Sequence, residues 1–194
     1  MFIRLRRTLV ALSFLIASGT ATATTIDFES FTDVQVLTNQ IGGLTFQYAT
    51  ILSAGQSLNE FEFPPRSGNN VIVNTQGLLV IDFATPVTSI QAYLTYNKPL
   101  YMAVGDVNNF AVGQDGSDFF ANLALSGPGT PNELFTLDYA PGIYRVAFTS
   151  FDYTPFSFVI DDLTFTPMNR VPEPASLALV LIGLLAARRQ LKRN

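Results

Sequence analysis

Ile90-Gln91-Ala92-Tyr93-Leu94-Thr95 stands near the middle of this 194-residue chain. Its first, third and fifth side chains are apolar, and the residues between them carry polar groups. A period of two places alternate side chains on opposite faces of an extended chain, so this stretch predicts a half-buried β-strand. Shortly before it, residues 71–73 and 78–81 are almost continuous apolar runs, which is typical of strands buried on both faces.

Strand patterns continue outward in both directions. Further strands are predicted at 26–29, 44–48, 101–104, 110–112, 119–125, 134–139, 143–148 and 156–165. Clusters of Gly, Pro, Asn and Ser separate them, and no long stretch of residues 24–170 has a helical period. About ten strands without alternating helices predict an all-β domain, a two-sheet sandwich of the jelly-roll type, over residues 24–170. We expect a signal helix before it and a hydrophobic helix after it.

Composition excludes several chemistries. The chain has no His, no Cys and no Trp, which rules out a Cys/His zinc site, a Ser-His-Asp triad, a thiol nucleophile and disulfide bonds. Residues 24–170 hold fourteen acidic and four basic side chains, a net charge of −10. This charge repels phosphates, so no nucleic acid partner is expected. A carboxylate pair acting on glycosidic bonds stays open, with Asp161/Asp162 or Glu60/Glu62, but nothing marks either pair as catalytic.

The first 23 residues have the three parts of a secretory signal peptide. A basic segment ends at Arg7, an apolar run covers residues 9–17, and Ala21-Thr22-Ala23 provides small side chains at a cleavage site. We therefore expect residues 1–23 to be removed after Ala23 by signal peptidase, following passage through the translocon. An uncleaved anchor is the alternative, and Arg6-Arg7 matches a twin-arginine signal only in part.

The other end of the chain is equally patterned. Val171-Pro172-Glu173-Pro174 precedes an apolar run that ends at Ala187, and four of the last seven residues are basic. Proline blocks a helix before residue 174, so a short transmembrane helix is predicted at about 175–187. Fourteen uncharged residues span about 21 Å at ~1.5 Å per residue, less than the ~30 Å hydrocarbon core. The basic cluster predicts a cytoplasmic C-terminus and an external domain.

Residues 171–194 resemble the PEP-CTERM sorting signal of Gram-negative bacteria, which often make exopolysaccharide. The resemblance implies recognition by exosortase, a membrane protease-transpeptidase, and removal of the tail near Val171-Pro172-Glu173-Pro174. It further implies transient residence in the inner membrane and then delivery to the cell envelope or the exterior. A permanent single-span anchor with the same orientation is the alternative.

A second resemblance concerns the domain itself. Ile26-Asp27-Phe28-Glu29 and the segment from Phe158 to Phe165 are similar to the framing motifs of galactose-binding-like jelly rolls. The resemblance implies that the first and last strands are neighbours. It also implies a structural calcium ion held by Glu29 and Asp161, with Asp27 and Asp162 as helpers. Calcium needs six to eight oxygen ligands, which these carboxylates would supply only in part.

Asp161 and Asp162 are adjacent in an otherwise apolar strand, so both cannot point to the same face. One of them must face inward, lie on a bulge, or bind a partner, because an unpaired buried carboxylate is costly. The alternative to calcium is that Asp162 is exposed while Asp161 accepts hydrogen bonds from backbone groups.

Two further candidates come from composition. One group of polar residues would either bind a second calcium ion or form a plain hairpin turn. These residues are Asp106, Asn108, Asn109, Asp115, Ser117 and Asp118. Six tyrosines could stack on sugar rings, although most aromatic residues are expected in the core. They are Tyr93, Tyr96, Tyr101, Tyr139, Tyr144 and Tyr153. Three functions remain open: a non-catalytic surface protein associated with adhesion or polysaccharide, a glycan-active hydrolase or lyase, and a permanently anchored membrane protein.

Overall fold

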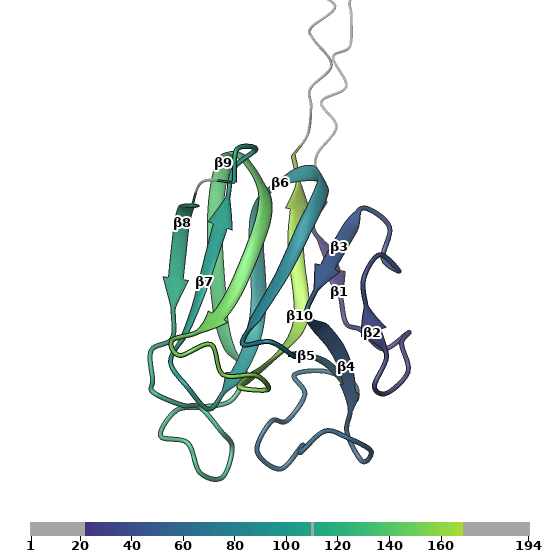
Figure 1. Ribbon diagram of the computed structural model, residues 1–194, viewed down its shortest axis with the longest axis vertical. Coiled ribbons are helices and arrows are strands. Elements are labelled where there is room, and N and C mark those ends of the chain that lie inside the picture. The colour runs from purple at the N-terminus through teal and green to yellow at the C-terminus, as the bar shows by residue number, and fades with distance from the viewer. Residues whose placement is uncertain (1–21, 110, 169–194) are drawn as a thin grey trace, which may run out of the picture. The chain divides into compact units, whose positions relative to one another are not determined.

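The computed structural model describes residues 22–109 and 111–168, and this part of the chain contains ten antiparallel strands and no helix (Figure 1). The all-β prediction is confirmed. The predicted signal helix and the predicted helix at about 175–187 lie outside the described residues. The strands are β1 (Thr24–Ile26), β2 (Val36–Leu37), β3 (Leu44–Gln47), β4 (Ala49–Ser53), β5 (Asn70–Asn74), β6 (Leu78–Tyr96), β7 (Leu100–Gly105), β8 (Ala111–Gly116), β9 (Glu133–Ser150) and β10 (Phe158–Pro167).

Two long strands build both layers of the sandwich. The first part of β6 pairs with β3 and with the second part of β9, while its last part pairs with β10 and with the first part of β9. Register shifts between Asp82 and Ser89 mark where β6 bends over from one layer to the other. The ladder of hydrogen bonds is therefore continuous through both layers. The sequence predicted separate strands at 78–81 and 90–95, and at 134–139 and 143–148, where the structure has one bent strand each.

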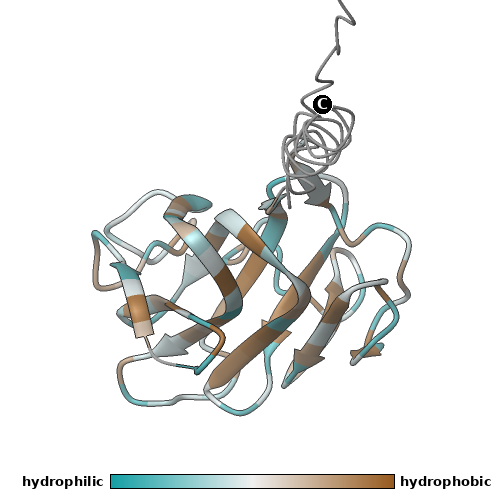
Figure 2. Ribbon diagram, turned by 90° about the horizontal axis from the view of Figure 1, so that it is seen from above, coloured by the Kyte–Doolittle hydropathy of each residue, from teal (hydrophilic) through white to brown (hydrophobic). Residues whose placement is uncertain are grey.

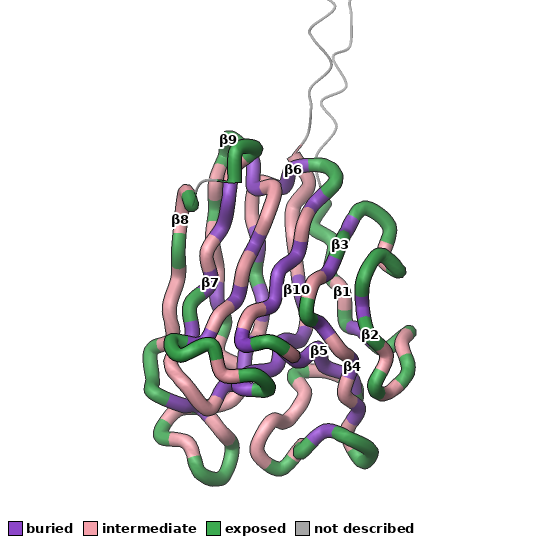
Figure 3. Tube along the Cα trace, in the orientation of Figure 1, coloured by how far each residue is buried: buried purple, intermediate pink, exposed green. Residues whose placement is uncertain are grey.

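The main core lies between the two layers. It takes alternate side chains from each strand, among them Ile81, Leu94, Val146, Phe148 and Ile160, all fully buried. Hydrophobic segments recur along the strands in Figure 2, and buried residues concentrate on them in Figure 3. β5 is buried on both faces, as its apolar run predicted, because residues 54–65 cover its outer side with a second cluster around Leu58.

The pairing of β1 with β10 places the first strand beside the last, with Thr24 opposite Phe165. The chain thus enters and leaves this domain at one end, where β6 and β9 bend over. The opposite end, here called the loop end, consists of residues 54–65, 97–99, 117–132 and 151–157. One predicted strand, 119–125, is wrong: these residues form no strand and belong to the loop end.

Candidate functional site

Glu29 lies just after β1 and holds a turn formed by residues 66–70. Its Oε1 accepts hydrogen bonds from the backbone N–H of Asn69 (3.0 Å) and of Asn70 (2.7 Å). Gly68, at the centre of this turn, has φ +53° and lies directly against the Glu29 carboxyl group. A side chain at position 68 would overlap that carboxyl, so the turn and the glutamate fit together only with glycine there.

Asp161 binds the same turn from the other side. Its Oδ2 accepts the N–H groups of Arg66 (2.7 Å) and Ser67 (2.9 Å), and its Oδ1 accepts the N–H of Asp162 (2.7 Å). Only 1% of this residue is exposed. Burial raises the pKa of Asp161 to about 6, because desolvation of the charge outweighs the lowering by these N–H donors.

Asp162 lies on a β-bulge. Between Asp161 and Thr164, β10 has one residue more than β6 has between their partners Tyr93 and Gln91. Asp162 takes up the extra residue with φ +46°, and its Oδ1 accepts the hydroxyl of Ser67 at 2.8 Å. The two adjacent acids are thus separated, one buried under the turn and the other on the bulge.

We name residues 66–70 with Glu29, Asp161 and Asp162 the carboxylate turn. The structure brings these three predicted residues together around one turn, while Asp27 accepts only the N–H of Glu29 (3.2 Å). Within residues 22–109 and 111–168, no three acidic side chains form a group that would hold a metal ion. Glu29 Oε2 and Asp162 Oδ2 accept no hydrogen bond from the described residues and fit calcium as oxygen donors. Calcium binding therefore stays a prediction.

A polar hollow of about 490 Å³ lies beside Glu29. Asp33 lines it as well, and its Oδ1 accepts the Ser57 hydroxyl and the N–H of Ser53 (2.8 Å). The hydroxyl of Ser57 lowers the pKa of Asp33. Sequence patterns did not single out Asp33, because its partners at 53–57 are brought to it only by the pairing of β2 with β4.

The second predicted calcium group does not assemble. Asp106 and Asn109 lie in the turn after β7, whereas Asp115 and Ser117 lie at the far end of β8, and the β7–β8 ladder separates them. Asp106 accepts the N–H of Asn108 (2.9 Å), as in a plain polar turn. Asp115 accepts the N–H of Thr136 (3.0 Å), which ties β8 to β9 instead.

Seven of the large apolar side chains that are exposed in the described residues belong to the loop end. They are Phe61 (70%), Phe119 (44%), Phe120 (65%), Leu125 (76%), Phe151 (71%), Tyr153 (64%) and Phe156 (58%). Among the predicted stacking tyrosines, only Tyr101 and Tyr153 are this exposed. Tyr96 is buried and bonded to Glu133, and Tyr93 lies 4.6 Å beneath the Arg66 guanidinium.

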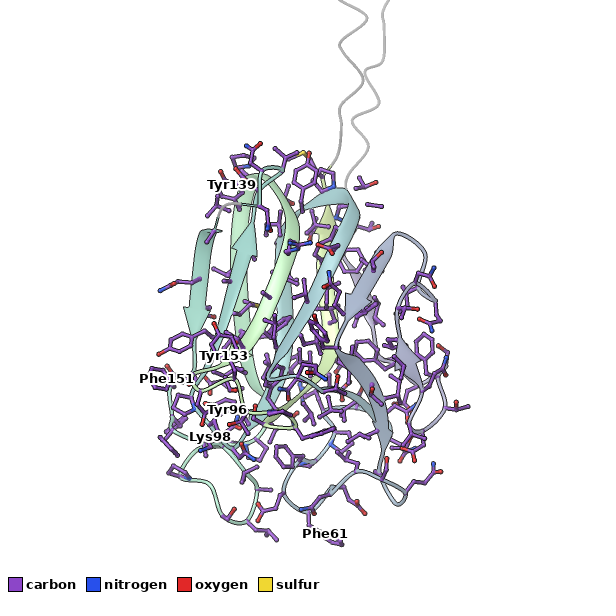
Figure 4. All side chains as sticks on the ribbon, in the orientation of Figure 1. Phe61, Tyr96, Lys98, Tyr139, Phe151 and Tyr153 are labelled. Atoms are coloured by element: carbon purple, nitrogen blue, oxygen red, sulfur yellow. The ribbon has the colours of Figure 1, made fainter. Side chains whose placement is uncertain are left out.

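Hydrogen bonds join the loops of this end into one surface. The N–H of Ala124 donates to Glu62 O (3.0 Å), that of Asn122 to Tyr96 O (3.0 Å), and that of Asn97 to Ser157 O (2.9 Å). The turn 97–99 thus lies between the loops 117–132 and 151–157. Figure 4 shows Phe151, Tyr153 and Lys98 on one side of this end, Phe61 at its tip and Tyr139 at the opposite end.

Sequence patterns did not reveal the exposed phenylalanines, because apolar residues are expected in strands or in the core. Phe119 and Phe120 have the composition of a strand but precede Gly127, Pro128, Gly129 and Pro131, which indicate a loop. Two members of the candidate carboxylate pairs have a shifted pKa, Glu62 and Asp161. Although desolvation acts against it, the N–H groups of Leu125 and Ser126 lower the pKa of Glu62, and Asp161 is buried.

Comparisons with known proteins found a motif match in the C-terminal tail and solved structures similar to the β-sandwich domain. Residues 170–193 match the PEP-CTERM protein-sorting motif. The K2 cleaved adhesin domain of Lys-gingipain is similar in structure, with a TM-score of 0.50 and 18% identity over 75% of this chain and 99% of that domain. The K1 domain from Porphyromonas gingivalis W83 has a TM-score of 0.49 and 14% identity over 74% and 97%. A family 29 carbohydrate-binding module complexed with cellulohexaose has 0.43 and 13% over 76% and 92%.

No curated protein matches the sequence. The structural likenesses show the fold alone, whereas the motif match confirms the sorting signal in the tail. The chain is therefore an exported surface protein, and its described domain is a β-sandwich. In residues 22–109 and 111–168, no helix is long and apolar enough to cross a membrane.

Proposed function

We propose that this chain is a non-catalytic surface or matrix protein of a Gram-negative bacterium and that its β-sandwich associates with extracellular polysaccharide in adhesion. The observation that carries the proposal is the group of exposed aromatic rings at the loop end. Exposed apolar patches of this kind mark binding surfaces, and aromatic rings present flat faces to ligands. Within the described residues, the chain enters and leaves at the other end of the domain, so the surface of the loop end is formed by its four loops.

The experiment is a binding assay on immobilised polysaccharides with the full chain purified in mild detergent. We expect retention by at least one polysaccharide and loss of retention when Phe61, Phe151 and Tyr153 are replaced together by Ala. All three are exposed, so the melting temperature of the triple variant should stay near that of the wild type. If none of the polysaccharides retains the wild type, the proposal is contradicted.

We further propose that signal peptidase removes residues 1–23 and that an exosortase removes the tail near Pro172-Glu173-Pro174. The predicted cut after Ala23 falls immediately before β1, and the last described residue, Met168, precedes Val171 by three positions. Neither cut would remove a strand. Mass spectrometry of the envelope form should find Thr24 as the first residue and no segment 177–187. An intact segment 177–187 would support the permanent anchor instead.

Structural calcium at the carboxylate turn is a separate proposal. The free oxygens of Glu29 and Asp162 support it, together with the polar hollow beside Glu29. Calcium would bind the folded state and raise the melting temperature of the full chain, whereas Asp161→Ala should abolish the rise. Magnesium serves as the control ion, because it requires a tighter octahedral set of ligands. An unchanged melting temperature of the wild type in calcium would reject the proposal.

A further inference from the structure

We propose that the loop end binds uncharged pyranose sugars on a platform formed by Phe151 and Tyr153 together with the ion pair of Lys98 and Asp152. This inference rests on the proposed association with polysaccharide and names both the place and the ligand class. The two rings are exposed by 71% and 64%. Lys98 Nζ lies 3.3 Å from Asp152 Oδ2, and their side chains are 39% and 43% exposed.

The loop 151–157 is held in place by backbone and side-chain hydrogen bonds. The N–H of Phe151 donates to Pro99 O (2.9 Å), next to Lys98, and the N–H of Tyr153 donates to Ser150 O (3.1 Å). Asn74 is fully buried and accepts the N–H of Ser157 (3.0 Å) through its Oδ1. The rings therefore belong to a fixed loop, and a ligand need not order it on binding.

The polar part of the platform suits sugar hydroxyls. An ammonium group donates hydrogen bonds and a carboxylate accepts them, whereas each hydroxyl does both. The hydroxyl of Thr154 and then Lys98 lower the pKa of Asp152, so Asp152 is a carboxylate at neutral pH and accepts hydrogen bonds. The aromatic rings on either side of Asp152 in the sequence supply apolar faces for the C–H surface of a pyranose ring.

Charge decides between classes of polysaccharide. Lys98, the cation of the described loop end, is already paired with Asp152, and Arg66, which lies next to the loop end in the carboxylate turn, stacks on Tyr93. Four acidic residues belong to the loop end or border it, namely Glu60, Glu62, Asp118 and Glu133. A uronate or sulfate polymer would meet these charges without a free cation, in a segment of net charge −10. An uncharged polysaccharide avoids this repulsion.

Affinity electrophoresis of the full chain in mild detergent tests the inference, with gels containing a neutral glucomannan, a neutral β-glucan or alginate. We expect a neutral polymer to retard the wild type and alginate not to. Phe151→Ala and Tyr153→Ala should each weaken the retardation by about tenfold. Val107→Ala is the control, since Val107 is 68% exposed in the turn after β7, away from the loop end.

A variant that lacks the Asp152 carboxylate should gain retardation by the charged polymer. Asp152→Asn removes the carboxylate from Lys98, so we expect alginate to retard this variant at low salt and not at high salt. Retardation of the wild type by alginate alone would overturn the inference while leaving the proposed function intact. If a neutral polymer retards the two ring variants as strongly as the wild type, the assignment of the binding site to Phe151 and Tyr153 is wrong. Absence of retardation by every polymer would overturn the proposed function and the inference together.

Discussion

Gly68 is the residue on which the carboxylate turn depends most directly. It has positive φ, and its α-carbon faces the Glu29 carboxyl with no room for a side chain. Gly55 also has positive φ, +74°, but nothing lies within 4 Å of the place where its Cβ would be. A comparison of alanine substitutions at these two positions therefore separates the cost of backbone strain from the cost of losing the contact with Glu29.

Gly68→Ala should lower the free energy of unfolding by roughly 3 kcal/mol, because left-handed strain adds to the loss of hydrogen bonds to Glu29. Gly55→Ala should cost about 1 kcal/mol from strain alone. Urea unfolding of the two variants and the wild type measures both values. Equal losses in the two variants would show that Glu29 contributes nothing at this turn.

Asp161 makes stability depend on pH. Its pKa of about 6 in the folded state exceeds the value of about 3.9 for an unfolded chain, so the folded state binds the proton more tightly. The contribution of this proton to the free energy of unfolding is complete below about pH 4 and is lost as pH rises through 6. The loss amounts to roughly 3 kcal/mol.

Asp161→Asn should remove this dependence, whatever it does to stability at a single pH. Denaturant unfolding in EDTA at several values between pH 4 and pH 7 gives the slope for each protein. The lowered pKa values of Asp33, Glu62 and Asp152 act in both proteins and cancel in the difference.

At the scale of the element, the bulge in β10 decides which side chains enter the core. Phe158 and Ile160 point inward before the bulge, and Leu163 and Phe165 point inward after it. In a regular strand, residues 160 and 163 would face opposite sides. The extra residue at Asp162 corrects this, so the carboxylate turn and the core packing of β10 depend on the same irregularity.

Insertion of one alanine between Asp162 and Leu163 should prevent cooperative folding, because Leu163 and Phe165 would then face outward or β10 would shift its register. Asp162→Gly should unfold cooperatively with a melting temperature near that of the wild type, since glycine accepts positive φ without strain. Circular dichroism during heating distinguishes the two variants. An insertion variant that melts like the wild type would show that the inward placement of Leu163 and Phe165 does not depend on the number of residues in the bulge.

At the scale of the whole molecule, the described part of the chain contains a hydrophobic core of its own. Among the described residues, the buried members of the main core run from Phe28 to Leu163. β1 closes the edge of β10, with Thr25 Oγ1 and Thr164 Oγ1 2.7 Å apart. A chain of residues 24–168 should therefore unfold cooperatively at the same temperature as the full chain in the same buffer, measured by calorimetry. A clearly lower melting temperature would show that residues outside this segment stabilise the domain.

The sequence by itself determined the features that depend only on residues close together in the chain. Alternation at residues 90–95 predicts the strand that forms there, and the paired acids at 161–162 require either a bulge or an inward carboxylate, both of which the structure contains. The tail needs no fold to be recognised, because its Pro-Glu-Pro, apolar run and basic end are contiguous. Such features depend on neighbouring residues alone, and periodicity records them directly.

Only the tertiary structure decided what the carboxylates and the exposed rings contact. Asp161 meets Arg66 across 95 positions of sequence, and no local pattern encodes that pairing. Phe119 and Phe120 have strand-like composition but belong to a surface loop, in which the N–H of Asn122 donates to Tyr96 O at the end of β6 and the N–H of Ala124 donates to Glu62 O in another loop. Which backbone partner a segment finds depends on the closure of long loops around one shared core, and this is settled by the whole chain at once.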